Sequence, residues 1–496
     1  MKLSDHSLRQ LDTTYLDGLD EEALRLLSAK LLEDLKEARE RLNQNSRNSS
    51  RPPSSEAPWV GPDDEPISVY DKADGKTVNE DEEDTTSGKE EVPSENADTS
   101  CPPEKPEKEV RRAGKLEGAQ GYGRKAPERI DLIEAHAPDS CACCDLSLSA
   151  RKMVAYTGHY EVDWIRTDRG DWQTRHIKHL WHETLCECGH LTRAEPPRRM
   201  EDAVEAGGFR LIGSGMATLI VALSLRYRLS RARIREFLSE WQGVWLSVGA
   251  IHNVIEEAGL AVIPVEAELI EAVQQSGLLH ADETPWPEQG AKGQSLWLWV
   301  FTSTYVTLYY VSHRGQELTG NLLENYSGRL MSDGWQAYRW LTRRLRCWAH
   351  LKRKAVGLTE SFSPEAQDFG QELLTLWAEL REAVLLAREG PPESIRAAFG
   401  DRIDVFRSRC ETMRTSTHKK TRELAGEFLN DWDAIFAVLD DPRWPLTNNH
   451  AERALRHWVI LRQLSHGTRT ERGSRGLALL AGVSDTCRQR GHSPWD

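Results

Sequence analysis

The sequence predicts a multidomain α/β protein in which a sheet carries acidic side chains at one edge. At 496 residues the chain is long enough for several domains. One apolar run, in GLLHADETPW, reaches Asp282 and then meets Pro285, which favours the end of a strand. A second run reaches Asp333 directly before Gly334, whose conformational freedom suits a turn. Together with Glu452, which follows two asparagines able to cap a helix, these acids suit a divalent-metal site for phosphoryl transfer.

The composition divides the chain into consecutive regions. Changes in charge, cysteine content and apolar spacing mark the borders between them. We expect these regions: 1–45, a leucine-rich helix or coiled coil; 46–125, a disordered acidic linker; 126–200, a zinc-binding region; 201–272, a helical, helix-turn-helix-like DNA-binding region; 273–350, the first part of an α/β core; 351–443, a helical insertion; and 444–496, the final core helices with Glu452.

The net charge of −14 belongs almost entirely to one segment. Residues 56–109 hold 18 Asp or Glu and 5 Lys or Arg, so the rest of the chain is close to neutral. Basic faces that bind nucleic acid therefore remain open elsewhere. No apolar run is long enough to cross a membrane and no signal-peptide core is present, so we expect no membrane and a cytoplasmic location.

Leucines spaced three and four residues apart predict a helix from Ala23 to Leu42. The repeat covers fewer than three heptads. A coiled-coil dimer and a helix packed on its own chain therefore both remain open. The acidic segment after it has few aliphatic residues, and we expect it to lack fixed structure.

Two cysteine knuckles, joined by strand-like stretches at 153–156 and 160–162, resemble a zinc ribbon. The first knuckle has the usual C-x-x-C spacing, whereas the second is C-x-C followed by a histidine. His190 or His182 is therefore a reserve ligand, and buried free thiols are the alternative. The expected Zn²⁺ ligands are Cys141, Cys144, Cys186 and Cys188.

An arginine-rich stretch follows an apolar run at 216–225. A helix at 230–240, a turn at Gln242-Gly243 and a second helix at 247–258, for which Ser247 is a plausible N-cap, fit a helix-turn-helix. An ordinary helical hairpin would look the same. The density of positive charge favours phosphate contacts by Arg228, Arg231 and Arg233.

The segment from Gly277 changes to strand patterns. Strands at 278–282, 296–302 and 306–311, a helix at 318–326, and strands at 330–332 and 346–349 follow the order of an RNase H-like core. The chain then becomes helical from about Leu351 to Leu439, and this insertion separates the second and third acids. The apolar side chains expected to face its core are Trp377, Leu380, Val384, Phe399, Val405 and Phe406.

Four motifs resemble those of bacterial DDE transposases of the insertion sequence 66 family. They are H-A-D-E-T-P-W, S-D-G-W-Q-A-Y, R-C-W-A-H-L-K-R-K and N-N-H-A-E-R-A-L-R. The leucine-rich helix, N-S-S-R-P-P-S-S and the cysteine region extend the resemblance over nearly the whole chain. It places the family's DDE triad on Asp282, Asp333 and Glu452, which would hold two Mg²⁺ or Mn²⁺ ions. Glu283 is a rival for Asp282, but alternation along a strand turns its side chain to the opposite face.

The resemblance implies a transposase that binds terminal inverted repeats and catalyses DNA strand cleavage and transfer. Its partners would be double-stranded transposon-end and target DNA, further copies of the chain on that DNA, and element-encoded accessory proteins. Its location would be the nucleoid. A non-catalytic DNA-binding relic remains an alternative, since the chain ends at 494–496, before a further helical stretch usual in the family. A nuclease without strand transfer is a third possibility. Further candidate DNA contacts are His350, Lys352, Arg353, Arg453 and Arg456.

Overall fold

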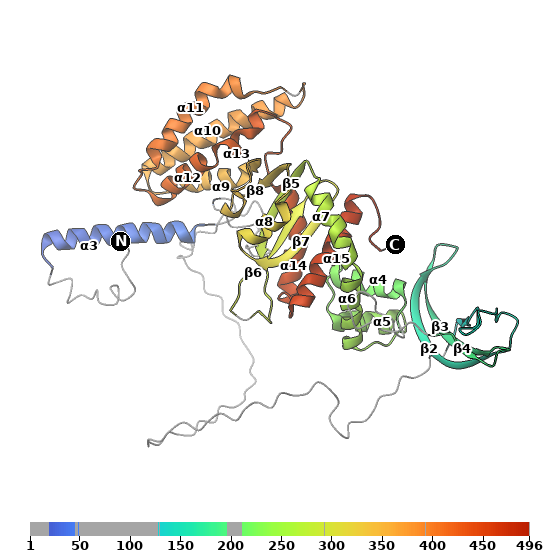
Figure 1. Ribbon diagram of the computed structural model, residues 1–496. Coiled ribbons are helices and arrows are strands. Elements are labelled where there is room, and N and C mark those ends of the chain that lie inside the picture. The colour runs from blue at the N-terminus through green and yellow to red at the C-terminus, as the bar shows by residue number, and fades with distance from the viewer. Residues whose placement is uncertain are drawn as a thin grey trace, which may run out of the picture. The chain divides into compact units, whose positions relative to one another are not determined.

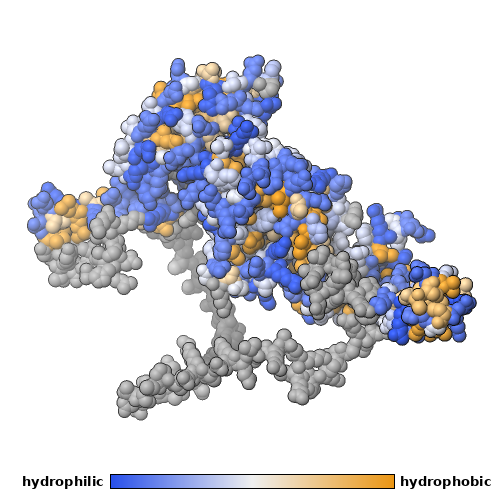
Figure 2. Space-filling model, viewed as in Figure 1, coloured by the Kyte–Doolittle hydropathy of each residue, from blue (hydrophilic) through white to orange (hydrophobic). Residues whose placement is uncertain are grey.

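The computed structural model describes residues 19–44, 48, 127, 129–195 and 211–496, except 292, 392 and 496. The predicted acidic linker lies almost wholly outside these residues. The first described helix is α3 (Glu21–Leu42), which begins where the Asp20 side chain accepts a hydrogen bond from the backbone N–H of Ala23. This confirms the predicted helix. Figure 2 shows hydrophobic side chains on its surface, where the exposed leucines are Leu24, Leu26, Leu31, Leu32, Leu35 and Leu42.

The two cysteine knuckles lie in the turns of a four-stranded sheet, one between β1 and β2 and the other between β3 and β4. Its centre is a long antiparallel hairpin, and a short strand pairs with the same central strand in the parallel direction. The stretches predicted at 153–156 and 160–162 belong to a single strand that has an irregularity between Ala155 and Thr157. The strands are β1 (Leu132–His136), β2 (Met153–Arg166), β3 (Trp172–Leu185) and β4 (Leu191–Arg193).

The arginine-rich region forms the two predicted helices, each started by a serine. The Ser230 hydroxyl accepts from the backbone N–H of Arg233, and Ser247 does the same for Ala250, so both helix starts are capped. Their inner faces pack with the preceding apolar helix. The elements are α4 (Ser214–Leu225), α5 (Arg231–Trp241), α6 (Val248–Ala261), η2 (Ile263–Val265) and α7 (Glu266–Gln274).

One described stretch, Val248–Gln274, has the length and the mean hydropathy of a membrane span, at 1.3. It is not one regular helix, because α6 and α7 are separated by η2, which contains Pro264. Val254 of α6 and Leu269 of α7 are buried in the protein. By length and composition alone the stretch would also pass as a membrane segment, and 17% of its most apolar window is buried inside the protein.

A five-stranded mixed sheet forms the centre of the region after Gly277 (Figure 1). Its strand order is β7-β6-β5-β8-β9, with β5, β6 and β7 antiparallel and with β8 and β9 parallel to β5. The strands are β5 (Leu278–Pro285), β6 (Leu296–Thr302), β7 (Thr307–His313), β8 (Arg329–Ser332) and β9 (Arg344–Arg346). The crossover elements are α8 (Gln316–Leu323) and η3 (Gln336–Tyr338).

Helices cover both faces of this sheet. Trp299 and Phe301 of β6 pack with α7 and α8, whereas Leu298 and Val300 of the same strand pack with α14 (Asn449–Ser465) and α15 (Glu471–Gln489). This alternation is the period of two expected for a strand. Side chains of successive β5 residues therefore also point to opposite helical layers.

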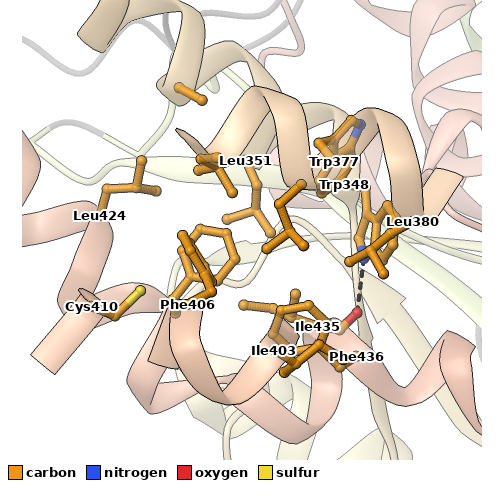
Figure 3. Packing of buried hydrophobic residues seen from close by; sticks show 14 of the residues in the cluster. Trp348, Leu351, Trp377, Leu380, Ile403, Phe406, Cys410, Leu424, Ile435 and Phe436 are labelled. Atoms are coloured by element: carbon orange, nitrogen blue, oxygen red, sulfur yellow. Dashed lines mark hydrogen bonds between the residues drawn. The ribbon is translucent and has the colours of Figure 1, made fainter. Parts of the chain in front are cut away.

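The helical insertion has its own core, shown in Figure 3. Side chains of α9, α10, α11, α12 and α13 meet there, and the Trp348 indole N–H donates to the Ile435 carbonyl at 2.8 Å. Trp377, Leu380 and Phe406 are buried as predicted. The elements are α9 (Trp348–Thr359), α10 (Pro364–Ala387), α11 (Arg396–Met413), α12 (Lys419–Asn430), α13 (Trp432–Phe436) and η4 (Ala437–Leu439).

Buried ion pairs fasten the insertion to the strand before it. Arg344 donates to Asp431 at 3.0 Å, and Arg346 donates to both Asp431 and Glu427. Lys354 of α9 reaches Glu427 at 2.6 Å. Such buried charges are stable only when paired, so β9 and α12 depend on each other.

Three predicted details are wrong. The fifth strand is not 346–349 but Arg344–Arg346, because the chain turns at Cys347 and α9 begins at Trp348. The first core strand continues three residues past Asp282, since Pro285 still pairs with Trp297 on its antiparallel side. Val405 is 67% exposed, because α11 turns its neighbour Phe406 inward instead.

Candidate active site and nucleic-acid interface

Asp282 and Asp333 lie two residues beyond the last paired residues of two adjacent parallel strands, β5 and β8. His280 of β5 pairs with Met331 of β8, and the same offset continued by two residues sets Asp282 opposite Asp333. Burial raises the pKa of Asp282 well above its usual value, and the charges of Asp333, Glu283 and Glu452 add to this rise. The sheet thus brings the predicted acids together in a setting that disfavours their joint ionisation.

Gly334 allows the chain to turn sharply after Asp333. Its φ of +94° lies in the left-handed region, which favours glycine. A Cβ atom here would overlap the guanidinium of Arg346, so the close approach of that side chain also requires glycine. The Asp333 carboxylate accepts from the backbone N–H of Trp335 at 2.9 Å, which closes the turn.

Glu452 reaches the site from the first turn of α14. The predicted cap, Asn448, occupies the N-cap position, but its side chain makes no capping bond. Instead it bonds to β5, at His280 and at the Ala281 carbonyl. Arg353 of α9 lies 3.6 Å from the Glu452 carboxylate. The third acid is therefore held between the sheet and a cation of the insertion.

His350 lies beside the same acid. Ligand atoms of Cys347, His350 and Glu452 are within 4.8 Å of one another. Nδ1 of His350 is buried without a hydrogen-bond partner among the described residues. Burial lowers the pKa of His350, while the Asp333 charge opposes that shift. The imidazole is thus oriented toward the acids, with one nitrogen open to a further ligand.

Glu283, the rival acid, has a different environment. Arg314 donates to it at 2.8 Å and the Tyr338 hydroxyl donates at 3.2 Å. Burial raises the pKa of Glu283 to about 7, Asp333 adds to the rise, and the Arg314 interaction opposes it. Tyr338 belongs to the layer with α7 and α8, opposite the layer of α14. The alternation along β5 therefore separates Glu283 from the side that carries Glu452.

A cavity of about 600 Å³ opens between the turn after Asp333 and the helical insertion. Its wall contains Gly334, and three arginines contribute to it, Arg339, Arg414 and Arg422. Arg339 follows η3, Arg414 follows α11 and Arg422 lies in the first turn of α12. Because they come from three separate elements, no single sequence motif predicted them. They form a basic surface next to the acidic site, partly balanced by Glu423 and Glu427.

The predicted DNA-contacting cations are distributed over several elements. Arg228 precedes α5 with a φ of +59°, and the pKa of Arg231 is lowered by burial and by nearby Arg469. Arg233 is exposed and already paired with Glu236 at 2.7 Å. Three further candidates are exposed on the starts of α9 and α14, namely Lys352, Arg453 and Arg456.

The four predicted zinc ligands lie together. Sγ atoms of Cys141 and Cys188 are 3.6 Å apart, as are those of Cys144 and Cys186, and all four lie within 4.8 Å. Tetrahedral Zn–S bonds of about 2.3 Å would set sulfur atoms roughly 3.8 Å apart. The backbone N–H of Cys143 lowers the pKa of the Cys141 thiol to about 6. The reserve ligand His190 is not part of this group.

Comparisons with known proteins identify a family for the part of the chain that holds the three acids. Residues 210–476 match the model of the transposase IS66 family. Residues 14–77 match a family of unknown function, DUF6444. The three acids and the cavity all lie within the first match.

Curated relatives are found in Sinorhizobium fredii (strain NBRC 101917 / NGR234). The uncharacterized protein y4qI is 28% identical over 258 residues, covering 46% of this chain and 48% of that protein. The uncharacterized protein y4jD is 22% identical over 402 residues, covering 76% of each chain. The match to y4qI, like that to y4jO at 44%, spans about half of the relative's length. Because the model of the IS66 transposase family matches more than half of the residues of this chain, the chain belongs to that family.

Proposed function

We propose that the protein is a DDE transposase that cleaves and joins DNA at the ends of an insertion sequence. The observation that carries the proposal is that Asp282 of β5, Asp333 after β8 and Glu452 of α14 interact electrostatically, since burial and then the charges of both other acids raise the pKa of Asp282. The strand order supports an RNase H-like core, because three antiparallel strands are followed by two parallel ones beside the first.

The acids fit Mg²⁺ or Mn²⁺, since hard carboxylate oxygens suit these ions and a buried cluster of negative charge needs a cation. Two such ions, when bound, activate the attacking oxygen and stabilise the leaving one. Asp282, Asp333 and Glu452 would hold these ions through their carboxylate oxygens. His350 and Arg353, which lie beside Glu452, would orient the substrate phosphate.

The basic surfaces would position double-stranded DNA. Arg228, Arg231 and Arg233 would neutralise phosphates of the terminal inverted repeat. Lys352, Arg453, Arg456 and the three cavity arginines would contact DNA near the acids.

The exposed leucine seam of α3 would pair copies of the chain as a coiled coil on DNA. Zn²⁺ held by the four cysteines would fix the two knuckles. Binding to DNA would locate the protein at the bacterial nucleoid, and accessory proteins encoded by the element would be further partners.

The deciding experiment is a cleavage and joining assay on DNA that carries the ends of the source element, with Mg²⁺. The wild type should nick the 3′ ends and join them to target DNA. Asp282→Asn, Asp333→Asn and Glu452→Gln should each lose both steps by orders of magnitude, while end binding persists.

Glu283→Gln is the matched control and should lose much less activity. Cleavage without joining would identify a nuclease. End binding with no cleavage by the wild type would favour a DNA-binding relic. Full activity in all the variants would overturn the assignment of the acids.

A further inference from the structure

A column of stacked aromatic rings lies on one face of the four-stranded sheet formed by β1, β2, β3 and β4. It shares no residue with the three acids or with the four cysteines. His136 of β1, His159 of β2 and His179 of β3 stack with ring centroids 5.2 Å and 4.7 Å from the central His179. Trp181 stacks on His136 at 4.0 Å. Two acids join this column, Glu134 and Glu161.

The contacts on one side of His179 have the spacing of a metal site. Nε2 of His136 lies 2.9 Å from Nδ1 of His179, and Glu134 Oε2 lies 3.3 Å from the same Nδ1. Tetrahedral Zn–N and Zn–O bonds of about 2.0 to 2.1 Å would separate ligand atoms by roughly 3.3 Å.

The other nitrogen of His179 supports this assignment. Its Nε2 is buried without a hydrogen-bond partner among the described residues, and Glu161 lies 3.7 Å away. An ion on Nδ1 would fix the proton on Nε2, where it faces the Glu161 carboxylate. A metal-binding histidine usually directs its second N–H toward a carboxylate in this way.

We propose that Glu134, His136 and His179 bind Zn²⁺ at a site that shares no residue with the four cysteines. Nitrogen and carboxylate ligands suit this borderline ion. The Glu134 side chain is 44% exposed, so solvent can reach the site and supply a fourth ligand. The ion would fasten β1 to β3, which pair only over the five residues of β1.

One contact favours this side of His179 over the other. His159 and Glu161 also come within 4.8 Å of His179. However, the Trp181 indole N–H donates to Nδ1 of His159 at 3.4 Å, which engages one of that ring's nitrogens.

The test uses the full-length chain without an affinity tag, stripped of metal under reducing conditions and titrated with Co²⁺ in excess Mg²⁺. The excess Mg²⁺ is added to compete with Co²⁺ for the carboxylates of the proposed active site. Cobalt in the cysteine group gives an intense thiolate charge-transfer band, whereas cobalt on nitrogen and oxygen gives only weak visible bands. His136→Gln and Glu134→Gln should each bind about one ion fewer per chain than the wild type and keep the thiolate band.

The thiolate band reports that the knuckle region is folded in each variant. His190→Gln is the matched control, because His190 is exposed and outside both ligand groups, and it should bind as many ions as the wild type. Cys144→Ser should lose the thiolate band and keep the weak bands. Equal cobalt uptake by the wild type, His136→Gln and Glu134→Gln would overturn the proposal, as would a wild type that binds cobalt through thiolates alone.

Discussion

The side chain of Asn448 donates a hydrogen bond of 2.8 Å to the carbonyl of Ala281, the residue before Asp282. Its oxygen lies 3.0 Å from Nδ1 of His280. Burial lowers the pKa of His280 to about 4, so the ring is neutral near pH 7 and its Nδ1–H donates to Asn448. The first turn of α14, with Glu452, is thereby fixed against the strand that carries Asp282.

Asn448→Ala should reduce DNA cleavage without reducing DNA binding. The change leaves the Ala281 carbonyl and the His280 N–H buried without partners, at a cost of about 1 to 3 kcal/mol each in the free energy of unfolding. A shift of Glu452 by about 1 Å would lower the rate roughly 100-fold. Single-turnover cleavage and thermal unfolding measure the two effects. Asn449→Ala, at the exposed neighbouring position, should match the wild type in both, and equal rates for the two variants would contradict this role of Asn448.

Asp282→Asn should raise the melting temperature of the metal-free protein near pH 7. The pKa of Asp282 is raised in the folded state, so folding loses stability as pH rises above the ordinary value of 3.8 toward the folded pKa. An amide removes this loss. Mg²⁺ should stabilise the wild type and have much less effect on the variant. Thermal unfolding with and without Mg²⁺ checks both, and an equal Mg²⁺ response would argue against a metal ligand at this position.

The combined change of Arg228, Arg231 and Arg233 to Ala should weaken end-DNA binding and flatten its salt dependence. Each phosphate contact contributes about 0.9 to the slope of log affinity against log salt concentration. Arg233 must give up its pair with Glu236 to reach DNA, so Glu236→Gln should strengthen binding. Titrations at several salt concentrations measure these effects. Unchanged slopes would leave these helices as an ordinary hairpin.

Cys186→Ser should abolish zinc binding by the cysteine group. Cys186 is buried beside Cys144, so its loss removes one of four closely spaced ligands. In limited proteolysis, the variant should then be cut much faster than the wild type between residues 130 and 196, because a structural zinc site contributes folding energy. Cys143→Ser, at an exposed cysteine outside the group, is the control.

Local sequence signals predicted the elements where the cause was itself local. Ser230 and Ser247 start their helices through bonds to residues three positions ahead, and both helices were predicted. The end of β9 was not predicted, since the buried Arg346 side chain is paired with Glu427 and Asp431, which lie 81 and 85 residues away in the sequence. An apolar run as short as 346–349 also cannot distinguish a strand from the start of a helix.

In the candidate site, too, the sequence predicted some residues and not others. Motifs singled out Asp282, Asp333 and Glu452, and the structure brings their side chains into electrostatic contact. Their roles as metal ligands stay predictions. The bond between Asn448 and His280, the cavity arginines and the histidine column depend on register and tertiary packing, which no single motif records.

The bond between His280 and Asn448 joins residues 168 positions apart. During synthesis the ribosome releases β5 first, then the whole insertion, and only afterwards the helix with Glu452. The ion pairs of Arg346 with Glu427 and Asp431 further require α12 to have folded onto β9. A nascent chain therefore has no complete set of the three acids until the whole insertion and the start of α14 have emerged.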